Sequence, residues 1–196
     1  MKYPWLPALL LVYPLYLFLA SHWPLIPPTI PAQSIRKNFT QQQLQYFSET
    51  AFEGSKPLKR WTEDIRIQVI GHASQEEQQD VAAAIRELEA LRLPVRISLV
   101  QSDENLPVSF LKKAEYEAQY KGDSPAPIGF VNYGKSDFNR ILSARIFVRT
   151  DIEERLKKHV FRHELCHALG LPSHSPSYYP LPNFMGKQVM DIHSFD

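Results

Sequence analysis

The sequence predicts an α+β domain with α/β-like layers, in which two main helices accompany a mixed sheet. An alternating strand pattern is followed by a long amphipathic helix, and several short β-like runs then precede a second long helix. Strands that pair beside one helix, with a second helix completing the sandwich, form a layered domain. No internal repeat and no glycine-rich phosphate loop interrupts this order.

The first elements have clear boundary signals. Residues 40–52 open with a threonine cap and place apolar residues among polar ones, which predicts an amphipathic helix. Residues 65–70 alternate as a half-buried strand does, and Gly71 ends the run. Residues 74–91 predict a second helix, because Ser74 and Glu77 form a capping box and apolar residues recur at helical spacing.

Short β-like runs and a final helix follow. The runs cover residues 95–100, 107–111, 128–131 and 141–148, with a charged helix or loop predicted over 112–121. The last helix is predicted from Thr150 to Leu169, because Thr150 and Glu153 form another capping box and Gly170 provides a stop. Only Arg149 separates this helix from residues 141–148, so we expect the strand to lead directly into it.

The amino-terminal residues predict export. No Lys, Arg, Asp or Glu occurs between Lys2 and Arg36, and residues 6–20 are strongly apolar. Residues 1–22 therefore predict a signal peptide or signal anchor, with a buried amino-terminal helix as the alternative. The proline-rich residues 23–33 predict a stiff spacer. We expect a protein that is secreted, periplasmic or anchored to the membrane by this amino-terminal segment.

The remaining residues 34–196 suffice for one domain with a core, but not for two. The formal net charge is +1 and no Lys/Arg cluster is present, which argues against nucleic acid as a partner. The single cysteine, Cys166, cannot form an intramolecular disulfide. We expect it to be a small buried packing residue.

A metal-binding pattern lies on the last helix. His163, Glu164 and His167 read His-Glu-Leu-Cys-His, and a spacing of four residues places both imidazoles on one helix face. Two such rings can bind one zinc ion, while Glu164 lies at its flank as a general base. The alternative is a pair of core or surface histidines that form hydrogen bonds elsewhere, because buried imidazoles require some partner.

The pattern extends beyond the helix. The run from His163 to Gly170, followed by a downstream Val-Met-Asp with Met190 at its centre, resembles the metzincin zinc metallopeptidases. The resemblance implies a metzincin-like mixed sheet whose second main helix carries the zinc ligands, with residues 34–196 as a metallopeptidase-like domain. It also implies that Gly170 turns the chain back to the metal and that Met190 lies below the site.

The third ligand departs from the resembled motif. Ser173 occupies the position of the third ligand, and His174 follows one residue late. Neutral serine is a poor zinc ligand, so we expect His174 to complete the site, with Asp191 and His193 as weaker substitutes. Because Gly170 can reverse the chain and Pro172 can stiffen the return, all three imidazoles should reach one ion.

These residues together predict zinc-dependent peptide-bond hydrolysis by an exported protein, with Glu164 as the general base on zinc-bound water. The expected cofactor is one zinc ion, and the expected partner is a peptide or protein substrate. An unpaired edge strand would bind that substrate in extended form. The alternative is a catalytically inactive exported module with a metzincin-like fold that binds peptide or envelope protein. A purely structural zinc site is disfavoured, because Glu164 and an open fourth position suit catalysis better than a closed Cys/His site does.

A second resemblance covers nearly all of the exported part. The resemblance is found in Phe39-Thr40, Tyr46-Phe47, Arg60-Trp61, Asp64-Ile65-Arg66 and residues 162–172. They resemble an uncharacterised bacterial family of exported proteins known only as a domain of unknown function. Many members of that family have Glu and Gln at the positions of His163 and His167, so this resemblance by itself implies no hydrolysis.

Overall fold

A five-stranded mixed sheet forms the centre of the computed structural model, which describes residues 39–52, 58–91, 93–122, 125–137 and 139–177. The strand order is β3 (Ile97–Leu99), β2 (Ile65–Ile70), β4 (Leu106–Leu111), β8 (Ala144–Arg149) and β5 (Gly129–Tyr133). Neighbouring strands are parallel except for β5, which runs antiparallel to β8 at one edge. The predicted α+β class is confirmed. Residues 1–33 lie outside the described part.

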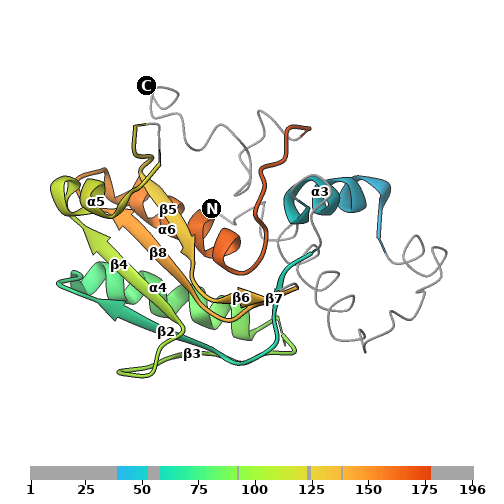
Figure 1. Ribbon diagram of the computed structural model, residues 1–196, viewed down its shortest axis with the longest axis horizontal. Coiled ribbons are helices and arrows are strands. Elements are labelled where there is room, and N and C mark those ends of the chain that lie inside the picture. The colour runs from blue at the N-terminus through green and yellow to red at the C-terminus, as the bar shows by residue number, and fades with distance from the viewer. Residues whose placement is uncertain (1–38, 53–57, 92, 123–124, 138, 178–196) are drawn as a thin grey trace.

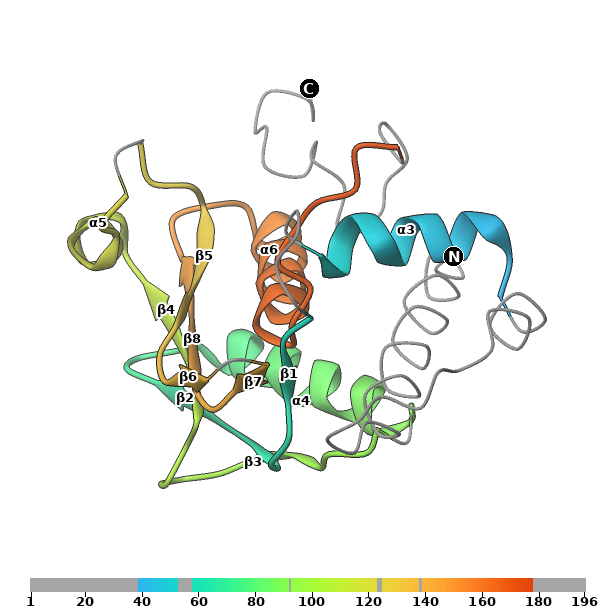
Figure 2. The same ribbon diagram turned by 45° about the vertical axis from the view of Figure 1, so that its right-hand side comes forward.

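The helices form layers around this sheet (Figure 2). Helices α4 (Gln75–Glu89) and α6 (Glu154–Ala168) lie on one face, and the short α5 (Lys113–Gln119) lies on the other. Helix α3 (Gln41–Ala51) lies beyond α6, on the side away from the sheet. Helix α6 is therefore enclosed between the sheet and α3, which explains why it is apolar on more than one side.

The predicted boundary signals are confirmed in the first half of the domain. Thr40 caps α3 in a capping box with Gln43, and Ser74 caps α4 in a capping box with Glu77. Strand β2 covers the predicted residues and ends at Gly71, whose φ of +86° suits glycine. These features depend on hydrogen bonds and conformational preferences within a few residues, so the local sequence is sufficient to predict them.

The predicted strand over residues 141–148 is wrong in one respect, because the chain changes sheets within it. Strand β7 (Arg140–Ile141) belongs to a small sheet with β1 (Arg60–Trp61) and β6 (Ser136–Asp137), and β8 begins only at Ala144. Between them, the backbone N–H groups of Leu142 and Ser143 both donate to the carbonyl of Lys135. This turn moves the chain from the small sheet to the central one.

The start of α6 also differs from the prediction. Thr150 does not cap the helix: its N–H donates to the carbonyl of Leu111 and continues the sheet. Glu153 is the N-cap, and its carboxylate accepts from the N–H groups of Arg155 and Leu156. A short link therefore separates β8 from α6, but the predicted order of strand followed by helix is retained.

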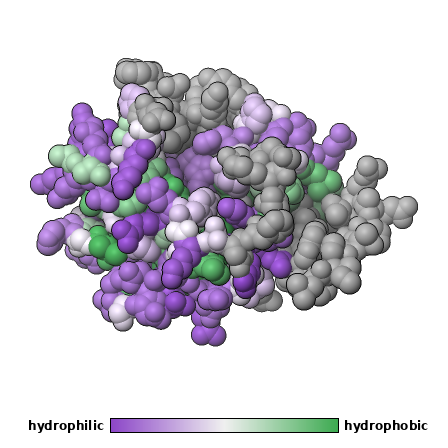
Figure 3. All heavy atoms as spheres, in the orientation of Figure 1, coloured by the Kyte–Doolittle hydropathy of each residue, from purple (hydrophilic) through white to green (hydrophobic). Residues whose placement is uncertain are grey.

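The core lies between the central sheet and helices α4 and α6. Its fully buried members include Ile65 and Ile67 on β2, Val108 on β4, and Ile146 and Val148 on β8. The face shown in Figure 3 is largely hydrophilic, with apolar side chains in small separate groups. Within the residues that the structure describes, no helix has both the length and the apolar character that a membrane crossing requires.

Candidate metal centre

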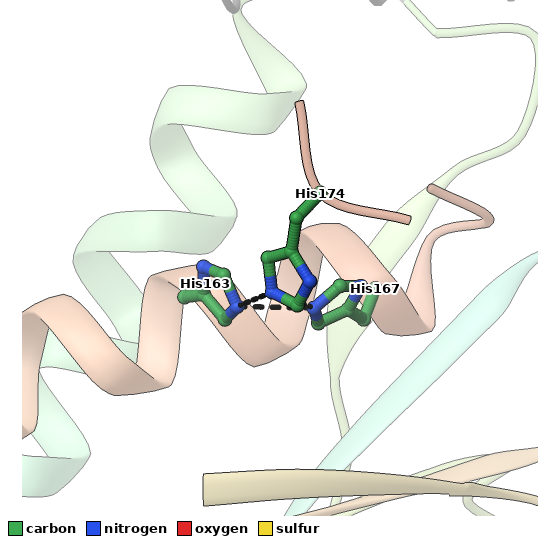
Figure 4. Close-up of side chains that lie close together, drawn as sticks. All are labelled: His163, His167 and His174. Atoms are coloured by element: carbon green, nitrogen blue, oxygen red, sulfur yellow. Dashed lines mark hydrogen bonds between the residues drawn. The ribbon is translucent and has the colours of Figure 1, made fainter. Parts of the chain in front are cut away.

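Three imidazoles meet beside the carboxyl-terminal half of α6. His163 and His167 project from α6, and His174 reaches them from the segment that follows the helix (Figure 4). The Nε2 atom of His163 lies 3.0 Å from that of His167 and 2.9 Å from that of His174, and the third pair is 3.3 Å apart. His163 is fully buried and the other two rings are half-buried. Together the three histidines could hold a metal ion.

The turn after α6 brings His174 back toward the helix. Gly170 adopts a φ of +110°, its N–H donates to the carbonyl of His167, and the N–H of Leu171 donates to the carbonyl of Cys166. These two hydrogen bonds form a Schellman motif, in which glycine reverses the chain direction. The expectation that Gly170 turns the chain back is confirmed.

The last carbonyls of α6 are also bonded to other elements. The hydroxyl of Tyr133, at the end of β5, donates to the carbonyl of His167, and the indole Nε1 of Trp61 donates to that of Ala168 at 2.9 Å. A helix end leaves its last carbonyls without donors from a following turn. Trp61 supplies the donor for Ala168, and Tyr133 adds a second donor to the His167 carbonyl, which already accepts from Gly170. They also fix the end of α6 that carries His163 and His167 to both sheets.

A backbone contact orients the ring of His167. Its Nδ1 lies 2.6 Å from the carbonyl oxygen of Leu171, which can only accept, so Nδ1 carries the hydrogen. Burial, aided by His174, lowers the pKa of His167 to about 4 despite that hydrogen bond. The ring is therefore neutral near pH 7, and its Nε2 lone pair faces the other two imidazoles.

Hydrogen bonding cannot account for all three close contacts between the Nε2 atoms. Each of these nitrogens carries either a proton or a lone pair, so at least two of the three must carry the same. At least one of the three close nitrogen pairs therefore joins two donors or two acceptors. A cation placed between the rings would instead be attracted to all three lone pairs.

Glu164 follows His163 on α6 and lies against β5. It is 2 % exposed, and its Oε1 forms no hydrogen bond with any described residue. A Cβ atom built on Gly129 of β5 would lie 2.9 Å from that oxygen, so the strand backbone passes close beside the carboxyl group. Burial raises the pKa of Glu164 to about 8. An unpaired buried carboxyl group is costly unless a ligand, water or ion uses it.

Comparison with known families assigns the chain to one of them. Residues 32–181 match the family described as "Protein of unknown function (DUF2927)". The chain belongs to this family. A search of curated proteins finds no match. The DUF2927 match confirms the predicted resemblance to a family of unknown function, while the resemblance to metzincins stays a prediction.

The DUF2927 match includes all three histidines and Glu164. Ser173 occupies the third-ligand position of the resembled motif, and it is engaged elsewhere: its N–H donates to the carbonyl of Thr50, and its hydroxyl donates to the carbonyl of Phe52. The turn therefore presents His174, and not Ser173, to the other two rings. Met190, Asp191 and His193 lie outside the described residues, so their predicted roles stay untested.

One part of this arrangement was missing from the sequence prediction. Helix α3 contacts the segment that bears His174, and Glu49 accepts hydrogen bonds from Ser175 and Ser177. These residues are separated by more than a hundred positions in the sequence, and no local motif joins them. Cys166, predicted as a small packing residue, is buried.

Proposed function

We propose that this DUF2927 protein is a zinc-dependent peptidase, with His163, His167 and His174 as the metal ligands. The observation that supports this most directly is the approach of three Nε2 atoms that cannot all be joined by hydrogen bonds. Neutral imidazole is a preferred ligand of zinc, and three protein ligands with one open position are typical of catalytic zinc. The proposal includes the metzincin-like relationship that the sequence motif predicts.

The distances within the cluster fit this ion. Zinc–nitrogen bonds of about 2.0 to 2.1 Å at tetrahedral angles place two ligand nitrogens roughly 3.3 Å apart. The three observed separations are 2.9, 3.0 and 3.3 Å, so small rotations of the rings would complete the geometry. The contact between His167 and the Leu171 carbonyl is the kind of outer hydrogen bond that orients a zinc-bound imidazole.

Glu164 is the proposed general base. Zinc, when bound, supplies a Lewis acid that polarises the scissile carbonyl and activates water. The Glu164 carboxylate would take the proton of the attacking water and later deliver it to the leaving amine. A cation on the adjacent rings favours the ionised carboxylate, which is the form that a base requires. Its unpaired Oε1 leaves an acceptor available for this proton.

Strand β5 is the proposed binding edge for an extended substrate. Among the described residues it pairs only with β8, and Gly129 at its start lies beside Glu164. A peptide added along this edge would form main-chain hydrogen bonds and pass close to the proposed base. The substrate class is therefore a peptide or an unfolded protein segment, and we further propose that the enzyme acts after export.

Zinc content and peptide digestion test this function. The purified protein should contain one zinc ion per chain, and His163→Ala and His174→Ala should each lose most of the zinc affinity. Glu164→Ala should retain zinc and lower cleavage of a peptide library by about 10²- to 10⁴-fold, because the base is not a ligand. His72→Ala, which removes an exposed histidine outside the site, serves as the control.

The outcomes separate the alternatives. Zinc binding without cleavage would favour the catalytically inactive binding module. Unchanged zinc affinity in His174→Ala would make the ligand assignment wrong, and Asp191 or His193 would be tested next. A parent protein without zinc affinity would contradict the metal site itself.

A further inference from the structure

The segment that bears His174 is held in place by α3. Figures 1 and 2 show the chain leaving α6 and running alongside α3. The N–H of Ser173 lies 3.0 Å from the carbonyl oxygen of Thr50, and the Ser173 hydroxyl lies 3.2 Å from that of Phe52. Both carbonyls belong to the end of α3, where intrahelical partners are lacking. The donor groups of Ser173 and the carbonyls at the end of α3 therefore satisfy each other's hydrogen-bonding capacity.

Glu49 makes the corresponding contacts on the other side of His174. Its carboxylate accepts from the Ser175 hydroxyl at 2.5 Å, from the Ser177 N–H at 3.3 Å, from the Ser177 hydroxyl, and from the Gln45 amide at 2.9 Å. Although burial alone would raise it, these hydrogen bonds lower the pKa of Glu49 to about 2. Ser175 is fully buried and Glu49 is half-buried, so the contact beside His174 is partly covered.

This anchorage matters because the three imidazoles differ in how they are fixed. His163 and His167 share one helix, and their separation is set by helical geometry. His174 lies on a segment without helix or strand structure, and the turn at Gly170 sets its direction but not its distance from α6. A ligand on a loose segment must lose conformational entropy when it binds, which weakens binding. The contacts from α3 restrict this segment in advance.

We propose that Glu49 is a positioning residue for the metal centre, holding His174 against His163 and His167 through Ser175 and Ser177. This inference rests on the proposed zinc function. In this role Glu49 acts through the segment that bears His174, by its hydrogen bonds with Ser175 and Ser177. Helix α3 is then part of the functional site, although it lies far from α6 in the sequence.

A comparison of variants tests this role by zinc affinity, measured by competition with a chromophoric chelator. Glu49→Ala should bind zinc about 10- to 100-fold more weakly than the parent, the loss typical of removing an outer-shell partner. Glu49→Gln retains one acceptor oxygen and should lie between the two. Ser48→Ala, an exposed change on the same helix, should bind zinc as the parent does.

The decisive measurement repeats Glu49→Ala in the background of His174→Ala. A residue that acts through His174 should have no further effect on zinc affinity once that ring is absent, whereas a general structural defect should persist. Weaker zinc binding by Glu49→Ala in both backgrounds, or parent-like affinity of folded Glu49→Ala, would overturn the positioning role. If Glu49→Ala does not fold, the same comparison with Glu49→Gln decides. A parent that binds no zinc would instead overturn the proposed function.

Discussion

At the residue scale, the position of the proposed base Glu164 depends on Gly129, which has no side chain. A Cβ atom on Gly129 would lie 2.4 Å from Cγ1 of Val160 and 2.8 Å from Cγ of Glu164. Separations this short are not tolerated between carbon atoms, so one of the elements would have to move. Val160 is fully buried and cannot rotate freely away. Glycine at this position therefore lets β5 lie directly against α6 beside Glu164.

We predict that Gly129→Ala retains zinc binding but impairs hydrolysis. The added methyl group should displace Glu164 and strain the core, with a stability loss of about 1 to 3 kcal/mol. Zinc titration, peptide digestion and urea unfolding measure the three effects separately. Gly71→Ala serves as a control for backbone strain, since its φ is +86° and, among the described residues other than its chain neighbours, no atom lies within 4 Å of a Cβ there. Unimpaired cleavage by Gly129→Ala would contradict this account of how Glu164 is placed.

Single residues also show how far the sequence could predict the site. The spacing of His163 and His167 on a helix, and the positive φ needed at Gly170, follow from local geometry. Ligand chemistry favours His174 over Ser173, and the structure brings His174 to the other two rings. The role of Glu49 could not be predicted, because its contacts join segments distant in the sequence and depend on the packing of α3.

At the element scale, charged pairs fix α6 to α4. The Lys157 ammonium lies 2.9 Å from Oε1 of Glu77, and both side chains are buried. The other Glu77 oxygen accepts from the N–H of Ser74, so one carboxylate both caps α4 and binds α6. Lys158 and Arg162 pair with acidic residues of α4 farther along, at the helix surface. These pairs therefore hold α6 against α4.

We predict that Lys157→Met lowers the free energy of unfolding by about 3 to 5 kcal/mol, because Glu77 would be left charged and buried. The double variant Lys157→Met with Glu77→Gln should recover part of this loss. Lys158→Met is the matched control: the Lys158 side chain is 49 % exposed, so its pair with Asp80 should contribute about 0 to 1 kcal/mol. Urea unfolding measures all three. Equal losses for Lys157→Met and Lys158→Met would mean that burial does not set the cost.

Elements with local signals were predicted well, and elements defined by distant pairing were not. The capping boxes at Thr40 and Ser74 and the alternation of β2 are readable in a few residues. The division of residues 140–149 between two sheets depends on the pairing of β7 with β1, about eighty positions earlier. Apolar periodicity does not reveal which sheet a short run joins.

At the scale of the whole molecule, the proposed metal centre lies where separate layers meet. Helix α6 provides two imidazoles, the following segment provides the third, and α3 holds that segment from the side away from the sheet. Tyr46 and Phe47 of α3 are buried and join the main core, so α3 is packed as well as hydrogen-bonded. The layered class was predictable, but the contribution of this outer helix to the site was not.

Zinc removal should therefore loosen α3 and the His174 segment more than the central sheet. A ligand that binds only the folded state stabilises it, by about 4 kcal/mol at a thousand times its dissociation constant, and the reverse holds on chelation. Because the metal would join His174 to α6, its loss frees the segment that α3 holds, and the two should open together. Hydrogen exchange after chelation should speed up in residues 46–51 and 171–177.

The central strands β4 and β8 provide the internal reference for this experiment, since their amides are paired within the sheet on both sides. Glu164→Ala, which retains the ligands, should show the same zinc-dependent protection as the parent. His174→Ala should show none in α3, because its metal would no longer reach the segment. If chelation removes zinc but leaves the hydrogen-exchange rates of residues 46–51 unchanged, then α3 and the proposed metal centre are not coupled. Each layer is then stable independently of the other.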